Sequence, residues 1–361
     1  MRIAYIAPRY APYVGGIETH VAHLARRAAQ QGHAVEVLTQ ETDPSLPTQE
    51  EVDGVTVRRF HAAVPAHNYT FAPGLWAYLA RRGHRYDILH AHNYHALPSL
   101  GAVLPRHHAL VFTPHYHGTG HSAFRSLLHV PYRLAGRLIF RRSRRVICMS
   151  DAEASVVCRH FPQVSDRVIV IPNGVDVAAL RTAQPYSRDG SVILSVGRLE
   201  EYKNVHRIVQ ALTHLDDTFT LVVIGGGPAR RSLEALVERL GLQGRVTFLG
   251  WVDDGTLHRW FRTASVYTSM SSHEAFGITV REALAAGTGV VASDIPAHRD
   301  AMAVAGPDTV SLVPLDACPT SVARAFRKTC TQTQDGTKLV HIASWDVVAE
   351  QTLQVYPALV A

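Results

Sequence analysis

The sequence predicts an α/β protein made of two doubly wound, parallel-sheet domains of similar size, and three observations lead to this prediction. The chain has 361 residues, which is too long for one typical domain and fits two. Short apolar runs rich in β-branched residues alternate with helical segments from the first residues onward. This alternation stops at a polar segment in the middle of the chain and then begins again.

The first domain is predicted to span residues 1–183. It opens with the strand RIAYIA, the glycine loop PRYAPYVGG, the helical run IETHVAHLARRAAQQG and the strand AVEVLTQ. A strand, helix and strand in about forty residues form a βαβ unit, which places the strands parallel. The segments that continue the pattern are DILHAHN, ALVFTPH, RRVICMS and VIVIPNG.

Residues 184–190, QPYSRDG, are polar and rich in turn formers, so we predict the interdomain linker there. The second domain, residues 191–344, restarts with SVILSVGRL and continues with FTLVVIGGG, RVTFLG, ASVYTSM and GVVASD. Ligands of such sheets bind at the carboxyl ends of the strands. We therefore expect a ligand site in a cleft between two facing domains.

The formal charge is +6, and nearly all the cations are arginine, since only Lys203, Lys328 and Lys338 are lysines. No basic stripe interleaved with aromatics occurs, so nucleic acid is not an expected partner. No apolar run approaches the roughly 18 residues of a membrane helix, and we expect a cytoplasmic protein. The four cysteines form no CxxC pair and suggest neither a zinc site nor a disulfide framework.

The segment SVGRLEEYKN places Arg198 and Lys203 in one loop just beyond a predicted strand. A guanidinium fork and a point charge from the same loop could hold a diphosphate. The alternative is a solvated basic loop. The choice of lysine in an arginine-dominated chain favours the functional interpretation.

The segment SHEAFGITVREALAAG, residues 272–287, places Glu274 in a loop and Glu282 in the helix that follows. We expect Phe276 to Thr279 to supply the first backbone amides of this helix, which lack internal partners and suit a phosphate. Helix capping alone explains one glutamate near a helix start, but it does not explain the pair.

Two further groups have simple alternatives. His90, His92, His95, His115 and His117 could imitate a metal site, but no acidic or thiolate partner completes a set. We expect polar groups that line the cleft and no metal. Arg133, Arg137, Arg141 and Arg145 recur every four residues. A solvated helix face explains them, and docking on an anionic membrane or steering of an anionic acceptor is the alternative.

Taken together, ExFGxxxxE at Glu274–Glu282, SVGRLEEYKN, PYVGGIETHV, FTPHYHG and VIPNGVD resemble the retaining GT-B glycosyltransferases of family four. The resemblance covers nearly the whole chain and implies that residues 345–361 form a helix that crosses back onto the first domain. Residues 249–287 are similar to bacterial mannosyltransferases that glycosylate phosphatidylinositol.

The resemblance implies roles for individual residues of a site for a nucleotide diphosphate sugar. Glu274 would hold the donor sugar and Glu282 the ribose, while Arg198 and Lys203 would neutralise the leaving diphosphate. His115 would lie near the reacting centre. The other implied donor contacts are Gly15, Gly16, Leu249, Val252, Phe276, Gly277, Ile278 and Thr279. On the acceptor side we expect Tyr13, His92, Asn93 and Tyr116.

The predicted activity is transfer of a hexosyl group to a hydroxyl acceptor with retention of configuration, with a phosphate oxygen of the donor taking the acceptor proton. No DxD motif occurs, so we expect a metal-independent reaction without a cofactor. GDP-mannose is slightly favoured over UDP-glucose and UDP-N-acetylglucosamine. The alternatives are a GT-B sugar-nucleotide epimerase and a catalytically silent module that binds sugar nucleotides. The acceptor and the oligomeric state are left open, and peripheral contact with the inner face of an anionic membrane is possible.

Overall fold

The computed structural model describes residues 1–13, 15–62, 70–105, 109–116, 136–334, 340 and 342–360. The chain forms two compact units, and each is described by itself. Unit 1 consists of residues Met1–Gly174 and Trp345–Ala361, and unit 2 of Val175–Ser344. The C-terminal segment thus returns to the first unit, as the resemblance implies.

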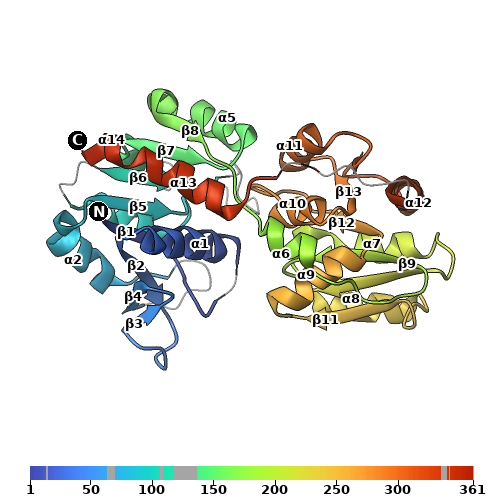
Figure 1. Ribbon diagram of the computed structural model, residues 1–361. Helices are drawn as coiled ribbons and strands as arrows, with labels where there is room; N and C mark the ends of the chain where they lie inside the picture. The colour runs from blue at the N-terminus through green and yellow to red at the C-terminus, as the bar shows by residue number, and fades with distance from the viewer. Residues whose placement is uncertain are drawn as a thin grey trace. The chain divides into compact units, whose positions relative to one another are not determined.

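Unit 1 contains an eight-stranded sheet in the order β3-β4-β2-β1-β5-β6-β7-β8 (Figure 1). All pairs are parallel except β3 with β4, a hairpin whose turn residues Asp53 and Gly54 both have positive φ. The strands are β1 (Arg2–Ala7), β2 (Ala34–Glu41), β3 (Gln49–Val52), β4 (Val55–His61), β5 (Ile88–His92), β6 (Leu110–Thr113), β7 (Arg145–Cys148) and β8 (Val168–Val170).

The helices of unit 1 bury apolar side chains against this sheet. α1 packs on β1, β2 and the C-terminal α13, while α5 packs on β7 and β8. The tyrosine after α13, Tyr356, is completely buried and hydrogen-bonds His90 of β5 and Tyr5 of β1. The helices are α1 (Gly16–Gln30), α2 (Pro73–Arg82), α3 (Leu97–Gly101), α5 (Asp151–His160), α13 (Trp345–Val355) and α14 (Pro357–Val360), with 3₁₀ turns at Gly83–Arg85 and Pro162–Arg167.

Unit 2 contains a fully parallel sheet in the order β11-β10-β9-β12-β13-β14. The strand order reverses between β9 and β12, which makes this pair the topological switch point of the sheet. The strands are β9 (Ser191–Val196), β10 (Phe219–Ile224), β11 (Val246–Gly250), β12 (Val266–Ser269), β13 (Gly289–Ser293) and β14 (Val310–Val313).

Alternate residues of each buried strand in unit 2 face opposite cores. In β9, Ile193 lies in the core beneath α7, α8 and α12, whereas Val192 and Leu194 lie in the core beneath α6, α9, α10 and α11. The helices are α6 (Val177–Thr182), α7 (Val205–Leu212), α8 (Arg230–Arg239), α9 (Asp254–Thr263), α10 (Ile278–Ala285), α11 (Pro296–Ala305) and α12 (Pro319–Gln334), with a 3₁₀ turn at Glu201–Lys203.

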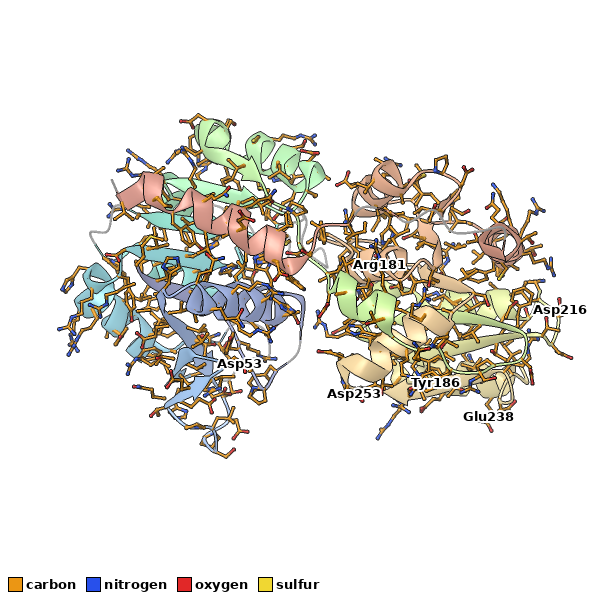
Figure 2. All side chains as sticks on the ribbon, viewed as in Figure 1. Asp53, Arg181, Tyr186, Asp216, Glu238 and Asp253 are labelled. Atoms are coloured by element: carbon orange, nitrogen blue, oxygen red, sulfur yellow. The ribbon has the colours of Figure 1, made fainter. Side chains whose placement is uncertain are left out.

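The boundary between the units differs from the prediction. Val175 donates its N–H to Ala343 O at 3.0 Å, and Leu180 of α6 is completely buried in unit 2. The predicted linker 184–190 also packs on unit 2, since Tyr186, which is labelled in Figure 2, donates its N–H to Thr263 Oγ1 and its ring contacts Trp260. The polar, turn-rich sequence of this segment correctly indicates a surface position. It gives no sign of the packing on α9, because the residues contacted lie some seventy positions further along the chain.

The predicted arginine face is only partly described. Arg133 lies outside the described residues, and Arg145 belongs to β7 rather than to a helix. Arg137 and Arg141 are exposed in the helical segment 136–142, beside Leu138, which is 48% exposed. Across the described part of the chain, no helix combines the length and the apolar character needed to cross a membrane.

Candidate functional site

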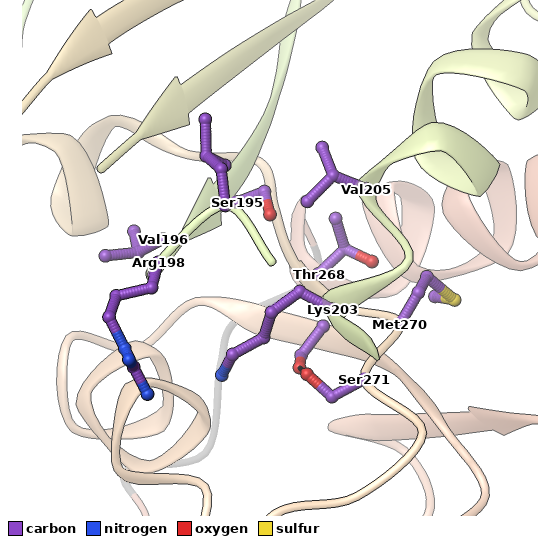
Figure 3. Close-up of a pocket in the computed structure, with 11 residues that line it drawn as sticks. Ser195, Val196, Arg198, Lys203, Val205, Thr268, Met270 and Ser271 are labelled. Atoms are coloured by element: carbon purple, nitrogen blue, oxygen red, sulfur yellow. Dashed lines mark hydrogen bonds between the residues drawn. The ribbon is translucent and has the colours of Figure 1, made fainter. Parts of the chain in front are cut away.

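The carboxyl ends of β9 and β12 form a small pocket at the switch point of unit 2 (Figure 3). The loop after β9 contributes Arg198 and Lys203, which extend toward the same side in Figure 3. The segment after β12 contributes Met270 and Ser271. The full lining is Ser195, Val196, Gly197, Arg198, Leu199, Lys203, Val205, Thr268, Ser269, Met270 and Ser271.

The two predicted cations differ in their surroundings. The Arg198 side chain is 61% exposed, and its Nη1 lies 3.6 Å from Glu200 Oε1. The Lys203 side chain is only 19% exposed, and its Nζ also lies over the Tyr202 ring, 5.3 Å from the centroid. The exposed Arg198 side chain can therefore change its rotamer to contact a ligand, whereas the Lys203 side chain is fixed by its neighbours.

Lys203 is held by the first glutamate of the predicted motif. Its Nζ donates to Glu274 Oε1 at 2.6 Å, and the Glu274 side chain is 18% exposed. Burial raises the pKa of the Glu274 carboxyl, whereas the Lys203 charge and hydrogen bonds from Lys203 and Ser271 lower it. The lowering is the larger effect, so the pKa of Glu274 lies below its ordinary value. Glu274 is thus kept ionised. We expected it to serve a sugar alone, and its pairing with Lys203 was not predicted.

Helix α10 begins where the prediction put it. Gly277 precedes the first turn with φ 71°, a left-handed conformation that favours glycine. Arg281 donates to Phe276 O and stacks on the Phe276 ring at 3.6 Å, which fixes the loop before the helix. Within the described chain no hydrogen bond is recorded for the N–H groups of Ile278 and Thr279. These amides are available to an anion.

Glu282 lies within α10, partly buried, and its environment is opposite to that of Glu274. Burial raises the pKa of the Glu282 carboxyl to about 7, and the charge of Asp254 adds to this. Among the described residues no hydrogen bond or ion pair to this carboxylate is recorded. A partly buried carboxylate without a protein partner is suited to accept hydrogen bonds from a ligand.

A buried polar network behind Glu274 was missed by sequence reasoning. Ser293 Oγ donates to Ser271 O, and His298 Nδ1 lies 2.8 Å from Ser293 O. His298 is completely buried, its Nε2 has no recorded partner, and it packs beside Gly277. Serine and histidine in the segment ASDIPAHRD carry no pattern that distinguishes them from ordinary loop residues, so only the fold could reveal this network.

The predicted donor contacts Leu249 and Val252 lie at the end of β11 and just beyond it. Leu249 and Trp251 are 37% and 59% exposed, whereas Val252 is partly buried against the core beneath α9. The Trp251 indole lies against Gly226, where a Cβ atom would come within 2.9 Å of Nε1. An exposed aromatic side chain against a glycine turn offers a flat apolar surface on which a base could stack.

In unit 1 the carboxyl ends of β5 and β6 bring four histidines together. The rings of His20 and His92 are 5.3 Å apart, those of His90 and His92 are 4.2 Å apart, and His92 Nδ1 lies 3.4 Å from His115 Nε2. All four are buried, and His115 has φ 49°. Strained backbone of this kind is concentrated at functional sites. His20, on α1, was not predicted.

These histidines are neutral in the folded protein. Burial lowers the pKa of His20 to about 4 and lowers the pKa values of His90, His92 and His115 well below the ordinary value. Among the described residues no group of three or more histidine, cysteine or acidic side chains could hold a metal ion. His117 lies outside the described residues.

The other predicted residues of unit 1 have different surroundings. Tyr13 donates its hydroxyl to Glu41, and Asn93, with φ 76°, accepts the N–H of His95. Tyr116 is 1% exposed and its hydroxyl lies 2.8 Å from His160 Nδ1, so its side chain stabilises the core instead of facing an acceptor. Gly15 and Gly16 lie at the start of α1. His95, partly buried, lies beyond the end of β5.

We expect unit 1 to lose stability in mild acid. A histidine whose folded pKa is depressed stays neutral in the fold while the unfolded chain takes up a proton, so the free energy of unfolding falls as the pH drops below about 6.5, by up to about 1.4 kcal/mol per pH unit and histidine. Burial raises the pKa of Glu153 to about 7, so this carboxyl adds stability as the pH falls, but it is one group against the four histidines. The free energy of opening obtained from hydrogen exchange of α1 should therefore fall more steeply between pH 6.5 and 5 than that of α9. Equal slopes in both units would contradict this assignment.

Comparison with known proteins agrees with this geometry. Residues 14–179 match the family described as Glycosyltransferase Family 4, and residues 178–310 match Glycosyl transferases group 1. An uncharacterized glycosyltransferase of Methanocaldococcus jannaschii is 30% identical over 82% of this chain and 81% of its own length. The phosphatidyl-myo-inositol mannosyltransferase of Mycolicibacterium smegmatis is 30% identical over 99% of this chain and 93% of its own.

Among solved structures, the sucrose-phosphate synthase of Thermosynechococcus elongatus has a similar fold, with a TM-score of 0.78 and 22% identity over 99% of this chain and 98% of that chain. Its similarity supports the architecture of two parallel-sheet α/β domains. The chain belongs to glycosyltransferase family 4 and is a glycosyltransferase of the GT-B fold.

Proposed function

We propose that the protein transfers a hexosyl group from a nucleotide diphosphate sugar to a hydroxyl acceptor, with retention of configuration and without a metal ion. The observation that carries this proposal is the convergence of Lys203, Glu274 and the open amides of α10 beside the ends of β9 and β12. A cation, an ionised carboxylate and free N–H groups together match a diphosphate joined to a sugar.

Each group has a separate part in the proposed reaction. The bond between the anomeric carbon and the diphosphate oxygen breaks, and negative charge develops on the leaving nucleoside diphosphate. Lys203, Arg198 and the first amides of α10 stabilise that charge because they are already oriented toward it. The acceptor oxygen forms the new bond on the same face, and its proton passes to the departing phosphate oxygen. Glu274 orients the sugar and Glu282 holds the ribose.

The proposed donor is GDP-mannose, with UDP-glucose and UDP-N-acetylglucosamine as the alternatives. Support comes from the 30% identical relative that is named a mannosyltransferase and spans almost all of this chain. The exposed Trp251 beside Gly226 supports a stacked base but does not favour one base over another. Thermal-shift titration against these donors should show the largest stabilisation with the true donor, because ligand binding to the native state stabilises it by mass action.

We also propose peripheral contact with an anionic membrane at the inner, cytoplasmic face through the exposed Arg137, Leu138 and Arg141. Two cations beside an apolar side chain suit a surface of anionic lipids. Association with liposomes that contain an anionic phospholipid should fall as the salt concentration rises. Absence of association at low salt would leave these residues as an ordinary solvated face.

The activity is tested by measuring nucleoside diphosphate release from each donor, with and without a panel of hydroxyl acceptors and with a chelator present. Acceptor-dependent release that persists in the chelator and yields a product with the donor's anomeric configuration supports the proposal. Release of free sugar or an isomerised donor without any acceptor would instead indicate the epimerase alternative. Donor binding without turnover would indicate a binding module.

A further inference from the structure

The two side chains that would grip the donor are already bound to each other. Lys203 Nζ and Glu274 Oε1 are 2.6 Å apart, and both side chains are less than one-fifth exposed. The neighbouring pair of Arg198 and Glu200 is longer, at 3.6 Å, and its side chains are 61% and 35% exposed. A short, largely buried ion pair is screened far less by solvent than an exposed one.

This contact has a consequence for any ligand that contains a diphosphate. An ammonium group has three N–H donors, so a phosphate oxygen that approaches Lys203 would share it with Glu274, and the charge of Lys203 would be divided between two anions. Glu274 would then be an ionised carboxylate that is largely covered by protein and only partly compensated by its cation. Removing one partner of a buried pair is costly because the other charge is left uncompensated.

A nucleotide sugar can compensate both charges, whereas a free nucleoside diphosphate can compensate only one. The phosphates would share Lys203, and the sugar hydroxyls, which lie beyond the phosphates, would donate to the Glu274 carboxylate. Hydrogen bonds to a charged acceptor are stronger than those between neutral groups. The product of transfer lacks the sugar, so nothing in it compensates the charge that Glu274 no longer shares fully with Lys203.

We propose that the Lys203–Glu274 pair makes the site discriminate in favour of the intact donor and against the nucleoside diphosphate product. The inference rests on the proposed function, and it adds a selectivity that separate contacts to sugar and diphosphate would not provide. If Lys203 and Glu274 made only independent contacts to the ligand, a substitution of either residue would weaken binding. Competition between Glu274 and the diphosphate for the charge of Lys203 instead predicts that a substitution of Glu274 strengthens binding of the nucleoside diphosphate product.

The test is equilibrium titration of the full chain with GDP, UDP and their hexose conjugates. Glu274→Gln keeps the side-chain shape but removes the competing charge, so affinity for the nucleoside diphosphate should rise about three- to tenfold, while affinity for the nucleotide sugar should not rise. Glu200→Gln is the matched control at the exposed pair, and it should change the nucleoside diphosphate affinity by less than about twofold.

A second variant shows whether the effect passes through the lysine. In a Lys203→Gln background, Glu274→Gln should raise nucleoside diphosphate affinity by less than it does in the unsubstituted protein, because no cation is left to be shared, and the rise that remains measures direct repulsion between Glu274 and the phosphates. Circular dichroism and thermal unfolding of each variant establish that it is folded. Unchanged or weaker nucleoside diphosphate binding by folded Glu274→Gln would overturn the inference while leaving the proposed function intact. If the unsubstituted protein binds none of these nucleotides, the proposed function fails and the inference fails with it.

Discussion

Substitution of Lys203 by methionine is expected to lower turnover about 10²- to 10³-fold, which is the usual effect of removing one group that stabilises charge developing in a transition state. Lys203 lies in the 3₁₀ turn beyond β9 with its ammonium group oriented by Glu274, so its charge is in place before the reaction starts. Methionine keeps most of the apolar stem and removes only the charge. Single-turnover rates at saturating donor would measure the loss.

Lys328→Met is the matched control for this prediction, because Lys328 is an exposed lysine of α12. That variant should keep full turnover. Turnover within fivefold of the unsubstituted protein in folded Lys203→Met would show that Lys203 is not the charge that stabilises the leaving group. Thermal unfolding belongs in the same experiment, because the substitution also leaves Glu274 without its cation.

Substitution of Glu282 by glutamine is expected to change stability and binding in opposite directions. The pKa of Glu282 is raised by burial to about 7, so ionisation of this carboxyl costs stability above its unfolded pKa. The cost increases from about pH 4.5 and is complete above pH 7, where it amounts to at most about 3 kcal/mol. Glu282→Gln should therefore raise the free energy of unfolding at pH 8 and have little effect at pH 4.5.

The same variant should bind nucleoside diphosphates roughly ten- to a hundredfold more weakly at pH 8, because the ribose loses a charged hydrogen-bond acceptor. Denaturant unfolding at both pH values and calorimetric titration would measure the two effects. Glu238→Gln, at an exposed glutamate of α8, is the control and should change neither quantity. Loss of stability at pH 8 in Glu282→Gln would show that the carboxylate has a protein partner that the structure does not record.

The strands and the start of α10 could be predicted from the sequence because their causes are local. Runs such as SVILSV and FTLVVI are short, rich in β-branched residues and followed by glycine turns, which predicts buried strands, and Gly277 followed by good helix formers predicts a helix start. Arg198, Lys203 and Glu274 could be placed at one edge because parallel strands end there. Their mutual contacts could not be predicted, since the sequence gives no distance between segments some seventy residues apart.

Other features depend on packing between distant segments and had no local signal. His298 lies behind Gly277 only because α11 follows β13 next to α10. His20 joins the histidines of β5 and the β6 loop because α1 packs beside β1. Tyr116, predicted to face an acceptor, instead packs on Phe161 and His160. Aromatic residues in strand-end loops serve both cores and ligands, and their spacing does not distinguish these uses.

The proposed nucleoside diphosphate site lies in unit 2, where β9, β12 and α10 meet. A crystal structure of the protein with a bound nucleoside diphosphate would show whether the ligand binds there. We expect phosphate oxygens within hydrogen-bond distance of Lys203 Nζ and the first amides of α10, with the ribose hydroxyls at Glu282. A nucleotide whose phosphates lie elsewhere, with the Lys203–Glu274 pair still intact, would contradict this expectation.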